Sequence, residues 1–279
     1  LLTKYTDIKA TVEGVGPAGR WRAFMEEGKV DAGLHSATDF SWLYHGTGPY
    51  QGKPRWEQIR LMAQGFDVIL VTYTRKGDNI KNLSQLKGKT IGATVPGSGT
   101  NTIGPLAMLK VAGVTSENSK LVPFADFNEG AAALIEGRMD AFIFAANEAI
   151  QQIERATGVY LVPLTPEQQQ KVLELEPAYT KSTFPAGLYG YPENVSTIAH
   201  PSAYVARKEL SEGIVYTVLK TLWEHFDEFS AAHPRGKDFS IDNTLRKVGL
   251  PFHPGTIKYL KEKGRWNQEW EEYNKKQLE

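Results

Sequence analysis

The feature that most constrains this chain is an internal repeat. Glu27-Gly28-Lys29-Val30-Asp31-Ala32 returns 109 positions later as Glu136-Gly137-Arg138-Met139-Asp140-Ala141. An apolar helical segment precedes each copy and a short apolar strand follows it, and a further strand is expected upstream, at residues 8–12 and 120–124. A six-residue repeat can arise by chance, but here the predicted elements on both sides of the two copies also occur in the same order. Each copy therefore predicts strand, helix, glycine turn and strand.

The repeat predicts two similar α/β lobes in one chain. Gly28 and Gly137 follow the predicted helices, where a left-handed residue closes the last turn and glycine adopts it without steric penalty. A helix that links two strands over this length favours a right-handed parallel crossover. No charge run or Ser/Gly linker separates the lobes, so strands are expected to connect them. We assign residues 1–74 with 203–279 to lobe one and residues 75–202 to lobe two.

The remaining pattern predicts mostly helices after position 207. Before it, Ile59–Met62 and Phe66–Tyr73 indicate two consecutive buried strands, and an aromatic segment (Phe40, Trp42, Tyr44) follows residues 35–39. The later segments predict a long strand at 195–206 and helices at 211–229, 241–248 and 254–263.

Composition excludes several classes of function. Lys plus Arg total 32 and Asp plus Glu total 32 in 279 residues, so no basic excess points to nucleic acid or an acidic membrane. Cysteine is absent, which removes thiolate metal sites, Cys nucleophiles and disulfides. The six histidines show no metal-ligand spacing, so neither a metal nor a cofactor is expected. No apolar stretch reaches the roughly 18 residues of a membrane-spanning helix.

The chemically richest stretch is a strand, loop and helix at residues 90–111. A strand at Thr90–Ala93 leads through small polar residues into an apolar helix at Ile103–Val111. Pro105 lacks an N–H and is tolerated in the first helical turn, which places the helix cap at or beside Thr102. Ser98–Asn101 is then an exposed loop before a positive helix end, suited to a carboxylate or phosphate. A plain capped loop without a ligand is the alternative.

The catalytic motifs tested against this stretch fail. Ser98-Gly99 stands where a phosphate-binding loop requires Lys followed by Ser or Thr, and Thr102 occupies the last glycine place of a dinucleotide-binding loop. No serine nucleophile elbow follows a predicted strand. What remains is a protein that binds a small polar ligand at strand carboxyl ends.

Several motifs, in this order over residues 12–264, give the chain a family likeness. It resembles the TAXI class of solute-binding proteins of TRAP (tripartite ATP-independent periplasmic) transporters. The matching motifs are the Glu-Gly-x-x-Asp-Ala strand near Asp31, Gly46-Thr47-Gly48-Pro49-Tyr50, Leu86-Lys87-Gly88-Lys89, Gly97-Ser98-Gly99-Thr100, Glu136–Phe142, Pro185-Ala186-Gly187-Leu188-Tyr189 and His253–Tyr259.

The resemblance implies a two-lobe, periplasmic-binding-protein-like α/β fold with a ligand cleft between the lobes. It implies a receptor, not an enzyme, that captures a small carboxylate-type solute, an organic anion or amino acid, and delivers it to TRAP permease subunits. An extracytoplasmic monomer whose signal peptide has been removed is expected. The resemblance also implies a first strand-helix unit, which would precede Leu1, and the family's Gly-Gly-Ser-x-x-Asn loop reads Gly14-Val15-Gly16-Pro17-Ala18 here.

Carried over position by position, the resemblance implies a set of binding residues. Gly97, Ser98, Gly99, Thr100 and Asn101 would hold the anionic end of the ligand, Ser36, Thr38 and Asp39 would face them from lobe one, and Phe144, Asn147, Phe184 and Tyr189 would line the walls. Core packing is the alternative for each aromatic wall residue. Asp39 would repel an anion unless the ligand also carries an amine.

Two other classes of function stay open. An enzyme on the same fold, of lyase or cofactor-biosynthesis type, would need close titratable pairs that the sequence does not show. An effector-sensing domain of a transcription regulator would need a DNA-binding segment, and no basic patch or helix-turn-helix pattern is visible.

Overall fold

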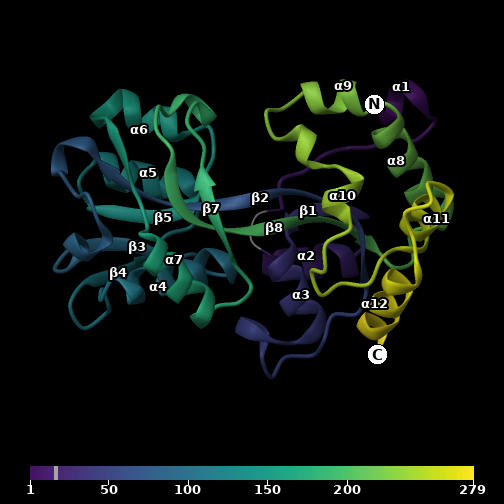
Figure 1. Ribbon diagram of the computed structural model, residues 1–279, viewed down its shortest axis with the longest axis horizontal. Coiled ribbons are helices and arrows are strands. Elements are labelled where there is room, and N and C mark those ends of the chain that lie inside the picture. Colours follow the sequence, from purple (N-terminus) through teal and green to yellow (C-terminus); the bar gives the residue numbers. More distant parts are fainter. Residues whose placement is uncertain (16–17) are drawn as a thin grey trace. The chain divides into compact units, whose positions relative to one another are not determined.

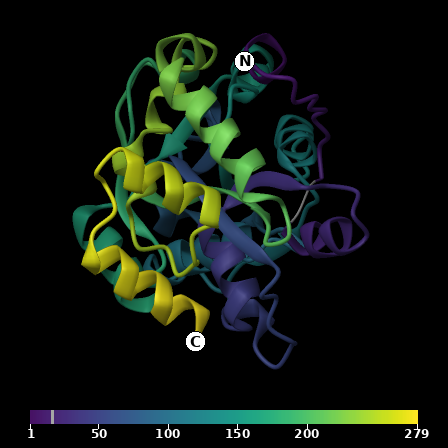
Figure 2. The same ribbon diagram turned by 90° about the vertical axis from the view of Figure 1, so that its right-hand side faces the viewer.

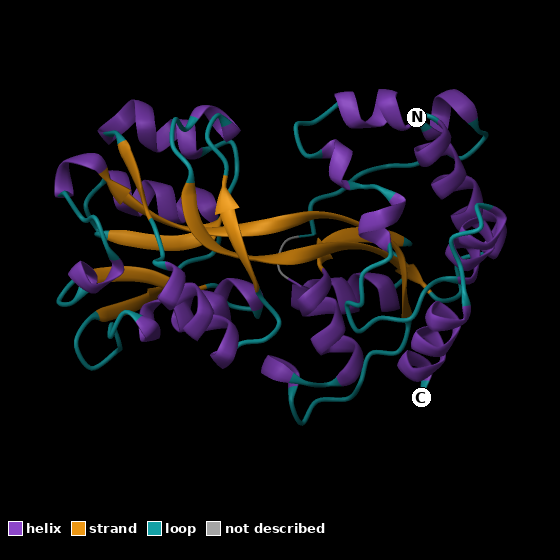
Figure 3. Ribbon diagram, viewed as in Figure 1, coloured by secondary structure: helices purple, strands orange, loops and turns teal. Residues whose placement is uncertain are grey.

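The computed structural model describes residues 1–15 and 18–279 (Figure 1). It divides the chain into two compact units, Leu1–Asp67 with Pro201–Glu279 (unit 1) and Val68–His200 (unit 2). These divisions fall a few residues before the 74/75 and 202/203 boundaries that the sequence suggested. The two longest strands, β2 (Ile59–Arg75) and β8 (Val195–Arg207), contain the division points (Figure 3).

The fold class is mixed α/β, as predicted. The strands pair in the order β1-β8-β2-β5-β3-β4, with β6 beside β2 and β7 beside β8. The remaining strands are β1 (Ala32–Ser36), β3 (Thr90–Thr94), β4 (Lys120–Pro123), β5 (Ala141–Ala145), β6 (Val159–Val162) and β7 (Thr180–Phe184).

Unit 2 is built around three parallel strands. β3 lies between β4 and β5 and is parallel to both, with Ile91 opposite Leu121 on one side and Ala141 on the other. The β4–helix–β5 connection confirms the parallel crossover predicted for the second copy of the repeat. Phe142 packs into one core while its neighbours Ala141 and Ile143 pack into a second, so β5 is buried on both faces. The helices are α4 (Thr100–Val111), α5 (Phe127–Ile135), α6 (Ile150–Thr157) and α7 (Pro166–Leu175).

Unit 1 pairs β1 with β8 in antiparallel register, from Ala32 opposite Ala206 to Ser36 opposite Ser202. Helix α11 packs against α8 (Figure 2). Gly255 allows this approach, because a Cβ there would lie 2.5 Å from the Glu212 carbonyl oxygen. The helices are α1 (Leu2–Tyr5), α2 (Ala18–Glu26), α3 (Ala37–His45), α8 (Glu212–Glu224), α9 (Phe226–Ala231), α10 (Ile241–Thr244), α11 (Pro254–Glu262) and α12 (Gln268–Leu278).

The repeat holds only from its helices onward. Gly28 and Gly137 both have positive φ, 69° and 74°, at the predicted helix ends. The strand predicted at residues 8–12 is wrong, because the chain there forms no strand. Apolar alternation produces a strand only where a neighbouring strand accepts its backbone hydrogen bonds, and β1 pairs with β8 instead.

Three other expectations were wrong in detail. The two strands at 59–73 are one continuous strand, β2. The helix expected at 211–229 breaks at His225 (φ −116°, ψ 37°), and the one expected at 241–248 ends at Thr244.

Candidate functional site

The carboxyl edge of the three parallel strands in unit 2 gathers several of the expected site residues. β3 ends at Thr94 and is followed by the turn at Gly97 (φ 82°) and by α4. β5 ends at Ala145, two residues before Asn147. Because parallel strands end at the same edge, the Ser98–Asn101 loop and the Phe144–Asn147 segment lie on one side of unit 2.

The Ser98–Asn101 loop is less exposed than predicted. Ser98 is 5% exposed, Gly99 is buried and Thr100 is fully buried, whereas Asn101 is half-buried. Ser98 Oγ accepts the Asn101 backbone N–H at 3.4 Å and Asn101 Nδ2–H at 3.1 Å. Asn101 Oδ1 is covered and meets no donor among residues 1–15 and 18–279. The loop is therefore held by its own side chains and leaves one acceptor unsatisfied.

The start of α4 differs from the prediction. The helix begins at Thr100 with Gly99 as its N-cap, not near Thr102, and Pro105 lies in the second turn. Thr102 Oγ1 instead hydrogen bonds with the backbone of Val95, accepting its N–H at 3.1 Å and donating to its carbonyl at 3.2 Å. A proline at this depth removes one i→i−4 hydrogen bond and crowds the preceding turn.

A tyrosine hydroxyl contacts the backbone of α4 beside this proline. The Tyr179 hydroxyl accepts the Gly104 N–H at 2.9 Å and donates to the Thr100 carbonyl at 2.9 Å, so it bridges two backbone groups one helical turn apart. Gly104 permits the approach, because a Cβ there would lie 2.7 Å from Tyr179 Cε1. Tyr179 thus fixes the first turn of the helix that follows the loop.

Unit 1 carries a comparable turn at the end of β1. Ser36 caps α3 and its Oγ accepts the Asp39 N–H at 3.1 Å. Thr38 and Asp39, in the first turn of α3, are 7% and 0% exposed. A carboxylate in this position is stabilised by the positive end of the helix. The sequence placed these residues correctly at a strand end but missed the helix that holds them.

A neutral histidine, His35, lies beside the Asp39 carboxylate. His35 Nδ1 lies 3.9 Å from Asp39 Oδ2, and burial lowers the pKa of His35 to about 4. The ring is therefore uncharged near pH 7, and this contact is not an ion pair there. Burial, with the Asp39 charge as a smaller contribution, raises the pKa of Tyr50. A buried carboxylate of this kind favours a cationic partner such as an amine.

Phe144 and Asn147 occupy the end of β5 in different ways. Phe144 is half-buried and packs edge-on against Phe124, with ring centroids 5.7 Å apart. Asn147 Oδ1 accepts the Ala149 N–H at 2.9 Å, which shapes the turn into α6. Phe144 keeps exposed surface at the same edge as the Ser98 loop.

Phe184 and Tyr189 flank a tight turn after β7. Phe184 is fully buried in the unit 2 core, where its ring meets Tyr191 edge-on at 5.9 Å. Tyr189 is half-buried, adopts a left-handed backbone (φ 51°), and packs with Phe144 on the same core. A left-handed tyrosine is uncommon and costs free energy, so the surrounding structure must stabilise it. The Phe184 ring packs against the Tyr189 ring, with centroids 6.4 Å apart, and Phe184 itself is not exposed to solvent.

Some expected positions fall elsewhere or were missed. Gly16 and Pro17 of the Gly14–Ala18 loop lie outside the described residues. Tyr179 was not foreseen, and the Gly104-Pro105 pair inside an apolar helix was the only pattern that could have drawn attention to it.

Within the described ranges, no cluster of three or more His, Cys, Asp or Glu side chains could hold a metal ion. None of the helices described here is both long enough and apolar enough to span a bilayer.

Comparison with known proteins gave one family and several solved structures. The sequence profile of the NMT1-like family matches residues 2–264. The periplasmic aliphatic sulphonate binding protein SsuA from Escherichia coli is 15% identical, with 94% of this chain and 73% of that chain covered and a TM-score of 0.49. Tv2483 bound to L-arginine is 15% identical, with 81% and 74% covered and a TM-score of 0.47. An ancestral arginine-binding protein is 19% identical, with 77% and 76% covered and a TM-score of 0.44.

Proposed function

The chain belongs to the NMT1-like family, and we propose that it is a solute-binding receptor for a small carboxylate-type solute, an amino acid or organic anion. Its ligand contacts would come from the strand-to-helix turns at Ser36 and Ser98. Binding, not turnover, is the activity that these turns favour, because they offer backbone amides and small hydroxyls.

The recurrence of one local arrangement in both units carries this proposal. In unit 1, β1 ends at Ser36, whose Oγ accepts the N–H of Asp39 three residues later. In unit 2, Ser98 Oγ accepts the N–H of Asn101 three residues later, at the start of α4. Each unit therefore presents, after a strand, a serine whose Oγ accepts the backbone N–H three residues later at a helix start, and such helix starts favour anions.

The two turns differ in charge, which suggests how a ligand with two kinds of group would be oriented. The unit 2 turn contains no ionisable side chain between Val95 and Thr102, so it suits the anionic end. The unit 1 turn contains Asp39, which suits an amine. An amino acid has both groups, and this pairing removes the repulsion that Asp39 would exert on a simple anion.

The resemblance to TAXI proteins supports the finer part of the proposal. On that basis the chain would act outside the cytoplasm and deliver its solute to the membrane subunits of a TRAP permease.

Native mass spectrometry of the purified protein tests the proposal first, by detecting a co-purified small molecule. Isothermal titration calorimetry then measures the affinity of that molecule, or of L-glutamate and succinate if none co-purifies. Saturable binding at one site is expected. If no small carboxylate binds and a substrate is instead converted, the protein is an enzyme and the proposal is wrong.

The loop assignment is tested by Ser98→Ala with Thr165→Ala as its control. Thr165 belongs to a different turn of unit 2, the one that begins α7, and its Oγ1 likewise accepts a backbone N–H three residues later. Both variants lose a hydroxyl that accepts a backbone N–H, a contribution of about 1 kcal/mol to stability. Only Ser98→Ala should weaken binding, by roughly 1.5–3 kcal/mol for a hydrogen bond to a charged group. Equal affinities in the two variants would contradict the assignment.

A further inference from the structure

Arg246 in unit 1 uses only one edge of its guanidinium group. It follows α10, and its Nη1 donates to Asp67 Oδ1 at 2.9 Å. Its Nε and Nη2 atoms are covered, and neither meets an acceptor anywhere in the described part of the chain. Two covered N–H donors of a charged group without partners are costly, so a missing partner is expected at this edge.

Gln64 contacts the Arg246 backbone and has an acceptor atom without a hydrogen-bond partner in the described part of the chain. Its side chain is fully buried, and its Nε2 donates to the carbonyls of Thr244 (3.0 Å) and Arg246 (2.7 Å). Its Oε1 finds no donor among residues 1–15 and 18–279. The Arg246 edge and the Gln64 amide thus bring two donors and one acceptor without partners to the same part of unit 1.

Contacts inside unit 1 place this group at the strand end that carries Ser36. Asp67, the partner of Arg246, follows Phe66 on β2, and the Phe66 carbonyl accepts from Ser202 Oγ at 2.7 Å. Ser202 is in turn the register partner of Ser36. Arg246 therefore belongs to the end of the unit 1 strands where β1 stops and α3 begins.

The side-chain charges around Arg246 do not oppose the binding of an anion. Arg235 donates to Asp238 Oδ2 at 2.7 Å and to the Asp67 carbonyl at 3.3 Å. Two arginines and two aspartates are present, so this cluster has no excess negative charge. The side-by-side Nε and Nη2 donors match the two oxygens of a carboxylate in a bidentate pair.

We propose that the Nε–Nη2 edge of Arg246 binds the carboxylate of the solute, and that Gln64 Oε1 accepts a hydrogen bond from a donor group on the same solute. This inference rests on the proposed receptor function and specifies its ligand class: a carboxylate beside an N–H or O–H donor. It assigns the carboxylate to Arg246 in unit 1 in place of the Ser98 turn.

The Arg246 Nε–H resonance in ¹⁵N NMR spectra tests the proposal directly, with sodium acetate as the probe. Arg246→Lys identifies the resonance, because lysine has no such group. Titration with acetate should shift it saturably, and titration with the uncharged analogue acetamide should not. A resonance that acetate leaves unchanged would show that the edge is closed to carboxylates, for example by a bound water, and would overturn the proposal.

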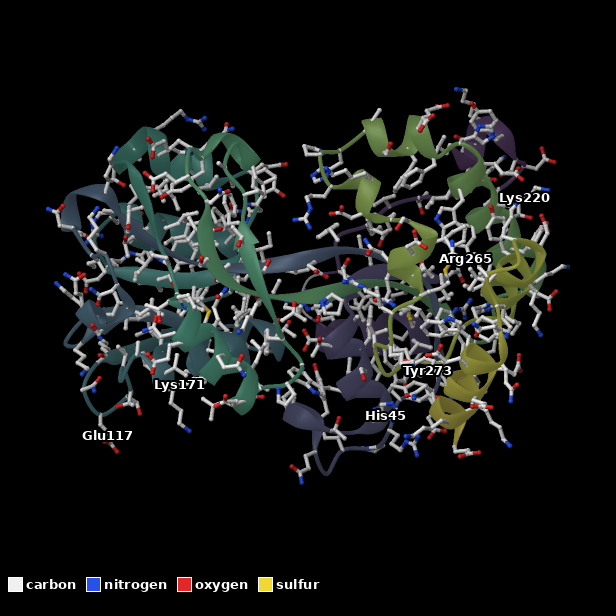
Figure 4. All side chains as sticks on the ribbon, in the orientation of Figure 1. His45, Glu117, Lys171, Lys220, Arg265 and Tyr273 are labelled. Carbon is white, nitrogen blue, oxygen red and sulfur yellow. The ribbon has the colours of Figure 1, made fainter. Side chains whose placement is uncertain are left out.

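Variants separate this inference from the receptor function. Arg246→Gln should weaken acetate binding about tenfold or more, the loss expected when charge-assisted hydrogen bonds disappear. Arg265→Gln is the matched control, since Arg265 is a more exposed arginine of the same unit, paired with Asp242 (Figure 4). Asp67→Asn removes the ion pair but keeps the free edge, and it should retain acetate binding.

The two proposals fail in different ways. A co-purified carboxylate that Arg246→Gln binds as tightly as the wild type would overturn the Arg246 assignment and leave the receptor function intact. An acetate response that depends on Arg246, with no organic solute bound, would overturn the receptor function and leave an anion site.

Discussion

Replacing Tyr179 by phenylalanine tests the hydroxyl bridge inside α4. The ring remains in the core, but the Gly104 N–H and the Thr100 carbonyl lose partners that lie 2.9 Å away on each side. Tyr179 is 2% exposed, so water does not replace the hydroxyl easily. Two buried backbone groups would lose about 1 kcal/mol each, and we expect the variant to be destabilised by about 2 kcal/mol.

Hydrogen exchange at the Gly104 amide is the most direct assay, because denaturant unfolding of a two-unit chain can combine several transitions. A loss of about 2 kcal/mol corresponds to roughly 30-fold faster exchange at that amide. Tyr191→Phe is the control: its hydroxyl accepts a single backbone N–H, from Leu161 at 3.2 Å, and its loss should cost about 1 kcal/mol without affecting Gly104. Unchanged Gly104 exchange in Tyr179→Phe would refute the bridge.

Two further predictions concern unit 1. Gly33→Ala would place a Cβ 2.0 Å from Trp21 Cζ3, and we expect a loss of about 1–3 kcal/mol in thermal unfolding, against little change for Gly213→Ala, where nothing lies within 4 Å. The pKa of His35 is lowered to about 4, so the unfolded chain binds a proton between pH 6.5 and 4 that the folded chain does not. Stability should therefore fall as the pH falls through that window, by up to about 3 kcal/mol. Urea unfolding of His35→Phe should show a smaller fall, and an identical pH profile would contradict this explanation.

Local rules predicted the parts of the fold that local contacts determine. The helix, glycine turn and strand around Gly137 follow from apolar spacing and from one residue with positive φ. The same rules predicted a strand at residues 8–12, and they failed there because a strand requires a partner that the local sequence does not specify. The Thr165 cap of α7 is determined in the same local way, because its partner Gln168 lies three residues along the chain.

The least predictable features depend on residues far apart in the sequence. Pro105 indicated a helix start near Thr102, but α4 begins at Thr100, and its first turn is contacted by Tyr179, 75 residues after Gly104. Arg246 stands in an unremarkable polar segment, and its pairing with Asp67 spans 179 positions. No periodicity or spacing rule reaches that distance, so such contacts appear only in the folded structure.

The order in which the chain leaves the ribosome follows from its division into units. Residues 68–200 are contiguous, so this unit has all of its strands and both of its cores available once His200 has emerged. The other unit needs Leu1–Asp67 and Pro201–Glu279 together, and β1 has no partner until the second half of β8 has been synthesised. During translation residues 1–67 must therefore wait, with their apolar side chains unpaired, until residues 202–206 of β8 have been made. This interval is when the nascent chain has the greatest need of chaperones.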